Sequence, residues 1–184
     1  MLLVTGGAGF IGSNVVAALN EAGRTDIVVN DVLGADRKWQ NLGKRQLADV
    51  VSSTELFRWL DRRKLDTVIH LGAISDTTAT DADLVIENNF RLSLKLLDWC
   101  TNARVPFIYA SSAATYGDGA AGFSDDWSPA ALERFKPMNL YGWRSTCSTA
   151  PSPIESFGRR SCRRNGRVSS SSTCSVRTNT TRAK

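Results

Sequence analysis

Short runs of consecutive apolar residues recur along the chain up to Ala110, and each run ends at glycine or polar residues. Runs without alternation of apolar and polar positions are typical of strands buried on both faces of a parallel sheet. We expect five such strands, the fourth running into a glycine turn. They are Met1–Val4, Asp26–Asn30, Leu47–Val50, Asp66–Ala73 and Val105–Ala110.

The segments between these runs carry apolar residues at helical spacing. A first helix is expected over Asn14–Glu21, and a second over Leu56–Leu60 with Ser53 or Thr54 as its N-cap. The longest is expected over Asp81–Thr101, with Leu84, Val85, Phe90, Leu94, Leu97 and Trp99 spaced for burial. Strands that alternate with helices predict an α/β protein with a Rossmann-like, doubly wound parallel sheet.

The turn between the first strand and the first helix carries Gly6, Gly9 and Gly12. Gly6 permits a tight turn, Gly9 lets backbone N–H groups approach a pyrophosphate, and Gly12 lets the helix pack closely on the strand. The N-terminus of the helix then faces the anion and stabilises its charge. This spacing between a strand and a helix predicts a dinucleotide-binding site.

Asp31 follows the second strand, at the carboxyl edge of the predicted sheet. An acid at this place accepts hydrogen bonds from the adenosine ribose of NAD. Arg37 and Lys38 lie a few residues later. They can neutralise the 2′-phosphate of NADP or form a solvated basic loop, so the residues alone leave the choice between NAD and NADP open.

Three polar features lie near the predicted cofactor edge. His70, the one histidine of the chain, sits in an apolar strand, which favours a packed core residue over a catalytic one. Asn88 and Asn89 interrupt the apolar face of the longest helix, where an amide is either solvated or braces the backbone of the site. Ser111 and Ser112 follow the fifth strand, and ligands bind at the carboxyl ends of strands in open α/β sheets.

The basic charge lies in the last part of the chain. Nine Lys and Arg residues against the single acid Glu155 give 144–184 a net charge of +8, whereas 14 basic and 17 acidic residues give 1–143 a net charge of −3. Because aromatic residues are not interspersed among these basic residues, the charge does not predict a nucleic-acid partner.

The four cysteines lack C-x-x-C spacing, so no metal site or disulfide framework is expected. Neither a signal peptide nor a membrane span is indicated, and the expected location is the cytoplasm.

Together these stretches resemble the extended short-chain dehydrogenase/reductases, and within them the ADP-heptose 6-epimerases. The resemblance covers residues 1–143. The stretches that carry it are Val4–Asn14, the strand ending at Asp31, Gly72–Ala73 with Ser75–Thr78, Asn88–Asn89, Tyr109–Gly117 and Pro137–Gly142.

The resemblance implies two catalytic residues, Ser112 and Tyr141, of which Tyr141 exchanges a proton with the substrate oxygen. It implies NADP as the cofactor, with NAD as the alternative. Besides the three glycines, the cofactor contacts that it implies are Phe10, Ile11, Asp31, Lys38, Leu71, Gly72, Ala73, Ile74, Ser75 and Asn88.

The reaction implied by the resemblance oxidises C6 of an ADP-heptose with bound NADP and returns the hydride to the opposite face, for lipopolysaccharide core biosynthesis. Full-length family members are expected to be homo-oligomers. Two alternatives stay open: another nucleotide-sugar 4-epimerase or 4,6-dehydratase, or a module that binds NAD(P) without catalysis.

The family's chemistry also implies a Tyr-x-x-x-Lys pair, because the lysine lowers the pKa of the tyrosine. The chain has Ser145 at that place, and from Arg144 onward 16 of 41 residues are Ser or Thr, a composition typical of a disordered tail. With suitable codons, loss of one base after Trp143 converts Ser-Lys-His-Leu-Phe into the observed Arg-Ser-Thr-Cys-Ser. We therefore expect an incomplete NAD(P)-binding Rossmann domain at 1–143, an out-of-frame tail at 144–184, and little or no turnover by this chain.

Overall fold

The computed structural model describes residues 1–35, 37–76 and 80–123, and the single residues 128, 130, 134 and 138. All of them belong to the first of two compact units, Met1–Ala150. Tyr141 and the segment 144–184, with its predicted irregular tail, lie outside the described residues.

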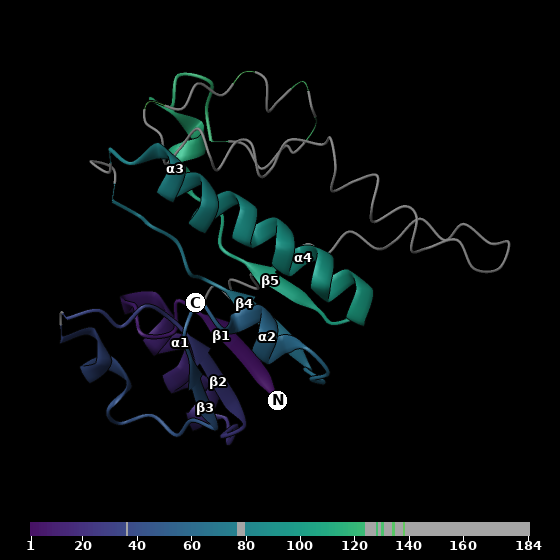
Figure 1. Cartoon of the computed structure of the whole chain (residues 1–184). Helices are drawn as coiled ribbons and strands as arrows, with labels where there is room; N and C mark the ends of the chain where they lie inside the picture. Colours follow the sequence, from purple (N-terminus) through teal and green to yellow (C-terminus); the bar gives the residue numbers. More distant parts are fainter. Residues whose placement is uncertain are drawn as a thin grey trace, which may run out of the picture. The chain divides into compact units, whose positions relative to one another are not determined.

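The described part of the chain is built on a five-stranded parallel sheet (Figure 1). The strand order is β3-β2-β1-β4-β5, which matches the first five strands of the Rossmann order 3-2-1-4-5-6. The strands are β1 (Leu2–Thr5), β2 (Ile27–Asn30), β3 (Asp49–Val51), β4 (Thr67–His70) and β5 (Phe107–Tyr109). All five strands that the apolar runs predict are thus present, with boundaries shifted by at most three residues.

Helices cover both faces of this sheet. One apolar cluster joins the strands to α2 (Leu56–Leu60) and α4 (Leu92–Ala103), and a second joins them to α1 (Phe10–Glu21) and the 3₁₀ segment η1 (Arg37–Leu42). The first cluster consists of Leu3, Val28, Val51, Leu56, Leu60, Leu65, Val68, Leu96 and Cys100. The second consists of Leu2, Val4, Ala8, Val16, Ile27, Val29 and Leu42.

Neighbouring residues of one strand fall into different clusters, as period-two alternation of side chains requires. Leu3 belongs to the first cluster and Val4 to the second, and both are fully buried. The doubly wound arrangement predicted from the sequence is therefore confirmed. Within the first cluster, burial raises the pKa of the Cys100 thiol to about 12, so this side chain packs as a neutral group.

The longest predicted helix is interrupted. It consists of α3 (Ala82–Val85), the π-helical segment η2 (Ile86–Arg91) and α4. A π turn contains an extra residue and rotates the apolar face of the helix. Leu84, predicted to be buried, is 50% exposed, whereas its neighbour Val85, and Leu96 and Cys100 on α4, are buried.

Two other helix boundaries differ from the prediction. Helix α1 begins at Phe10 rather than Asn14. In its first turn the large residues Phe10 and Ile11 are exposed and only Gly12 and Ser13 are buried, so this turn has no apolar face for the sequence to show. The N-cap of α2 is Glu55, and the hydroxyls of Ser52 and Thr54 pair with each other at 3.0 Å. The predicted cap at Ser53 or Thr54 is therefore wrong.

The amino end of the sheet is held by ion pairs. Arg24 contacts Asp26 at 2.8 Å and Asp66 at 2.6 Å, and the amine of Met1 contacts the same two carboxylates. Hydrogen bonds from Arg24, and then from the amine, hold the pKa of Asp26 well below its usual range. For Asp66 the hydrogen bond from the Met1 amine is the larger cause of the lowered pKa.

None of the helices in the described part of the chain has the length and apolar character needed to span a membrane.

Candidate functional site

The candidate site lies at the carboxyl ends of β1 and β4, the neighbouring strands from which the chain turns to opposite sides of the sheet. Open α/β sheets bind ligands at such switch points. Gly6, which follows β1, has φ of +68°, and a Cβ built on it meets the backbone nitrogen of Gly72 at 2.6 Å. Two loops therefore cross here in a contact that only glycine at position 6 allows.

The glycine turn delivers helix α1 to the same edge. Gly12 packs so closely under the turn that an added Cβ lies 2.1 Å from the Gly6 carbonyl oxygen. Gly9 is the N-cap of α1 and has no side chain to bond the first-turn N–H groups. Those donors and the positive end of the helix dipole suit a phosphate, so the residues present fit a dinucleotide.

Two predicted contact residues stand at the entrance to this turn. Phe10 is 84% exposed and Ile11 is 64% exposed, although both are large apolar residues. Their exposure next to the glycine turn places apolar surface where a bound nucleotide would cover it.

The carboxylate of Asp31 is bound to the glycine turn itself. Its side chain is only 6% exposed, and Oδ2 accepts from the backbone N–H of Ala8 at 2.8 Å. Oδ1 accepts from the backbone N–H of Val32 at 2.7 Å and from Lys38 Nζ at 2.6 Å. The acid that sequence analysis assigns to the ribose is therefore also a structural link, and Lys38 offsets its charge.

A side-chain amide of η2 braces the loop after β4. The predicted contact residues in this loop are Leu71, Gly72, Ala73, Ile74 and Ser75. Asn89 is fully buried. Its Oδ1 accepts from the Ile74 N–H at 2.7 Å, and its Nδ2 donates to the Ile74 carbonyl at 2.9 Å. The bracing role that the sequence left open for the asparagine pair is thus confirmed for Asn89.

Asn88 lies on a different face of η2. Its Nδ2 donates to the Leu84 carbonyl within the same helical stretch at 2.9 Å, and its side chain is partly exposed. The predicted contact between Asn88 and a cofactor remains a prediction.

A chain of hydrogen bonds ties the ends of β1 and β4 to α4. Ser93 Oγ donates to the Asn89 carbonyl at 2.6 Å, so it accepts from His70 Nε2 at 2.8 Å. The other ring nitrogen, Nδ1, then accepts from the Thr5 hydroxyl at 2.6 Å in the neutral tautomer. Thr5 Oγ1 in turn accepts from the Gly72 N–H at 3.1 Å.

These contacts settle the two interpretations of His70 in favour of packing. The side chain is 5% exposed, and its ring stacks on that of Phe107 with the centroids 5.9 Å apart. His70 therefore fixes the loop at Gly72 instead of reaching a substrate.

Replacing Asn89 by leucine is expected to lower the free energy of unfolding by about 2 kcal/mol, because it leaves the partly buried N–H and carbonyl of Ile74 without their partners. Urea denaturation measures the change. Asn88→Ala is the matched control, and its exposed intrahelical bond predicts a change below about 0.5 kcal/mol. Equal losses in the two variants would contradict the bracing role.

Ser112 lies at the carboxyl end of β5, where the sequence places it, as the N-cap of the 3₁₀ segment η3 (Ala113–Tyr116). Its Oγ accepts from the Ala114 N–H at 3.2 Å. This leaves the hydroxyl proton of Ser112 available for another partner. The second predicted catalytic residue, Tyr141, lies outside the described residues.

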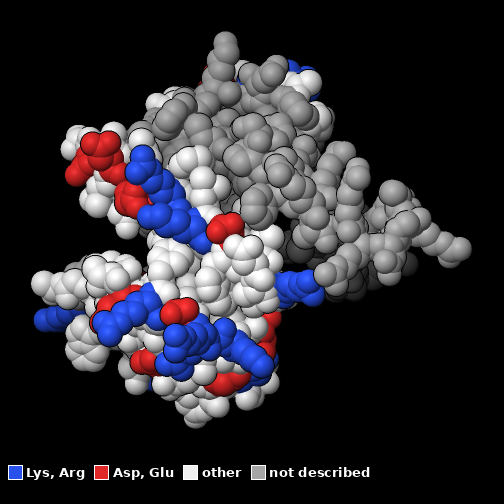
Figure 2. All heavy atoms as spheres, turned by 45° about the vertical axis from the view of Figure 1, so that its right-hand side comes forward, with Lys and Arg blue, Asp and Glu red and all other residues white. Residues whose placement is uncertain are grey.

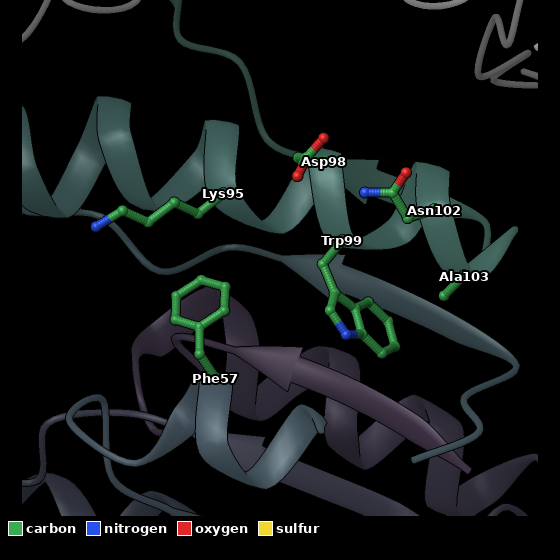
Figure 3. A pocket seen from close by; sticks show the side chains of 6 residues that line it. All are labelled: Phe57, Lys95, Asp98, Trp99, Asn102 and Ala103. Carbon is green, nitrogen blue, oxygen red and sulfur yellow. The ribbon is translucent and has the colours of Figure 1, made fainter. Parts of the chain in front are cut away.

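A shallow groove lies elsewhere, between α2 and α4 (Figure 3). It encloses about 450 Å³, and Phe57 on α2 faces Trp99 and Lys95 on α4 across it. None of the predicted site residues lines this groove. Figure 2 shows acidic and basic side chains next to one another on one face of the described part. Glu87 pairs with Arg91 at 3.4 Å and with Lys95 at 2.8 Å.

Sequence reasoning missed two contributors to the candidate site. Ser93 joins His70 to η2, and Asn41 donates from η1 to the Ala8 carbonyl at 2.8 Å. Each is a lone polar residue in a segment without a motif, so its role becomes visible only from the long-range contact.

The strand order and the glycine turn at the β1/β4 switch point define a doubly wound α/β protein of the class that binds dinucleotides. The sequence model of the NAD dependent epimerase/dehydratase family matches residues 2–149. The chain therefore belongs to this family.

Relatives with curated names point to one kind of epimerase. The chain is 45% identical over 147 residues to the ADP-L-glycero-D-manno-heptose-6-epimerase of Fusobacterium nucleatum, and 49% identical over 147 residues to the protein of that name in Nitratidesulfovibrio vulgaris. These matches cover 78% of this chain but only 44% and 45% of the relatives. The chain thus spans less than half the length of the curated relatives that it matches.

Solved structures agree on the fold. The Helicobacter pylori ADP-L-glycero-D-manno-heptose-6-epimerase matches with a TM-score of 0.68 at 29% identity, over 80% of this chain and 48% of that one. A Bacillus cereus UDP-glucuronic acid 4-epimerase in complex with NAD matches with a TM-score of 0.65 at 26% identity, over 86% of this chain and 51% of that one.

Proposed function

We propose that this chain is the nucleotide-binding part of an ADP-heptose 6-epimerase. The observation that carries the proposal is the glycine turn, in which Gly6 and Gly72 cross at the switch point and Gly9 opens the N-terminus of α1. The identity of 45–49% to proteins named as this epimerase supports the choice of substrate.

NADP is the proposed cofactor, with NAD as the alternative. An acid at the end of β2 ordinarily repels a 2′-phosphate. In this chain Lys38 Nζ lies 2.6 Å from Asp31 Oδ1, so the pair carries no net charge and tolerates the phosphate. Phe10, Ile11 and the loop from Leu71 to Ser75 are the proposed contacts along the rest of the dinucleotide.

In the proposed reaction, the nicotinamide ring supplies the hydride acceptor and donor. Tyr141 exchanges a proton with the C6 oxygen, Ser112 donates a hydrogen bond that orients the same oxygen, and the inversion requires a second acid/base on the far side of the sugar. Tyr141 requires a nearby cation to act at neutral pH, and Ser145 provides none. The chain as it stands is therefore proposed to bind the cofactor without efficient turnover.

Replacing Lys38 by alanine is expected to weaken NADP binding about tenfold, or about 1.4 kcal/mol, and NAD binding less than about threefold. The variant leaves the Asp31 charge unbalanced close to the 2′-phosphate. Isothermal titration with both cofactors measures the two dissociation constants. Lys44→Ala, an exposed cation just beyond η1, is the control. Equal weakening of both cofactors in the Lys38 variant would contradict this role.

A second candidate is a nucleotide-sugar 4-epimerase. A UDP-N-acetylglucosamine 4-epimerase from Methanobrevibacter ruminantium matches with a TM-score of 0.69 at 26% identity, over 86% of this chain and 50% of that one. The fold of the described part therefore fits both activities. Incubating the full-length enzyme with ADP-heptose and with UDP-hexoses, and identifying the products, separates them.

A further inference from the structure

We propose that Asn41 is a positioning residue for the phosphate-binding turn, because it fixes the peptide plane that leads into helix α1. This inference rests on the proposed dinucleotide binding for its functional consequence. Its structural part, the restraint on the turn, can be measured without any cofactor.

Ala8 is held on both sides. Its N–H donates to Asp31 Oδ2 at 2.8 Å, and its carbonyl accepts from Asn41 Nδ2 at 2.8 Å. Its methyl group is fully buried in the same apolar cluster as Val16 and Val29. The backbone of the turn thus has its N–H, its carbonyl and its side chain restrained at one residue.

The carbonyl held by Asn41 belongs to the peptide plane that it shares with the N–H of Gly9. That N–H bonds the Gly6 carbonyl at 3.0 Å, and Gly9 is the N-cap of α1. Glycine rotates easily about its own backbone bonds. A restraint on the plane before Gly9 therefore determines where the first-turn N–H groups of α1 point.

Segment η1 brings Asn41 to this place. Leu42, the next residue, is 8% exposed and packs in the same cluster as Ala8. About one helical turn earlier, Lys38 reaches Asp31. The two side chains of η1 therefore act differently, since Lys38 contributes charge near the 2′-phosphate and Asn41 holds the backbone that every dinucleotide contacts.

This difference predicts that substitutions of Asn41 and of Lys38 affect NAD and NADP binding differently. Asn41→Ala is expected to weaken NAD and NADP binding by the same factor, about tenfold, the effect of one lost hydrogen bond. Lys38→Ala discriminates between the two cofactors. Asn41→Leu, which keeps the size, loses the donor and adds no charge, is expected to behave as Asn41→Ala does. Gln40→Ala, an exposed neighbour, is the control and should match the unaltered chain.

The test combines titration with hydrogen exchange on the full 184-residue chain. In both Asn41 variants the amides of Ala8 and Gly9 should exchange about tenfold faster without cofactor, while the amide of Leu3 in the core of β1 keeps its rate. Unchanged exchange at Ala8 and Gly9, or acceleration that includes Leu3 equally, overturns the proposal. Failure of the unaltered chain to bind either cofactor contradicts the proposed function instead, and the exchange rates still decide the role of Asn41.

Discussion

Replacing Gly12 by alanine is expected to abolish dinucleotide binding and to lower the free energy of unfolding by about 3 kcal/mol. The new Cβ falls 2.1 Å from the Gly6 carbonyl oxygen and 2.8 Å from the Gly7 Cα, and both are backbone atoms that cannot rotate away. The turn and the helix must therefore separate. Urea denaturation and cofactor titration measure the two effects.

Gly43→Ala is the matched control for this substitution. Gly43 follows η1. A Cβ added to Gly43 would lie 3.4 Å from its nearest neighbour, the Gln40 carbonyl oxygen. Such a contact is ordinary, so stability and binding should stay within the error of the measurement. A Gly12 variant as stable as the Gly43 variant would show that the close packing of α1 on the turn is wrong.

Restoring one base after the Trp143 codon in the complete gene is the change with the largest expected effect on activity. We expect the corrected frame to encode Ser-Lys-His after Trp143 and to place a lysine four residues after Tyr141. The repaired enzyme should interconvert the two C6 epimers of ADP-heptose, while the present chain shows little or no turnover. Chromatography of the product measures the reaction.

Tyr141→Phe in the repaired enzyme is the control for that experiment. Loss of the acid/base group should reduce kcat about a thousandfold with the cofactor still bound. A gene that has no Lys codon in any frame at this place would refute the frame hypothesis. Turnover by the unrepaired chain would contradict the proposed inactivity.

Local patterns were sufficient to predict the sheet. Continuous apolar runs such as Ile27–Val29 have no exposed face to alternate with, so they report strands buried on both sides. The π turn at η2 could not be predicted in this way, because the spacing of apolar residues does not reveal one extra residue in a helical turn. The same spacing predicted burial for both Leu84 and Val85, and only Val85 is buried.

In the candidate site, too, residues of a contiguous motif could be predicted from the sequence, whereas residues that act through long-range contacts could not. The glycine turn is a contiguous motif, so the close contacts at Gly6 and Gly12 could be predicted from its spacing. The bond from Asn41 to Ala8 spans 33 residues, and that from Ser93 to His70 spans 23. Neither segment has a pattern that names its partner, and only the folded chain brings them together.

The central claim is that the carboxyl edge of β1 and β4 holds a nicotinamide dinucleotide. An NMR titration of the isotope-labelled chain with NADP tests it most directly, residue by residue. The account predicts saturable shifts of the backbone amides of Phe10, Ile11 and Gly72, with those of Phe57 and Trp99 in the α2–α4 groove unmoved. No saturable shifts, or shifts confined to that groove, would contradict it.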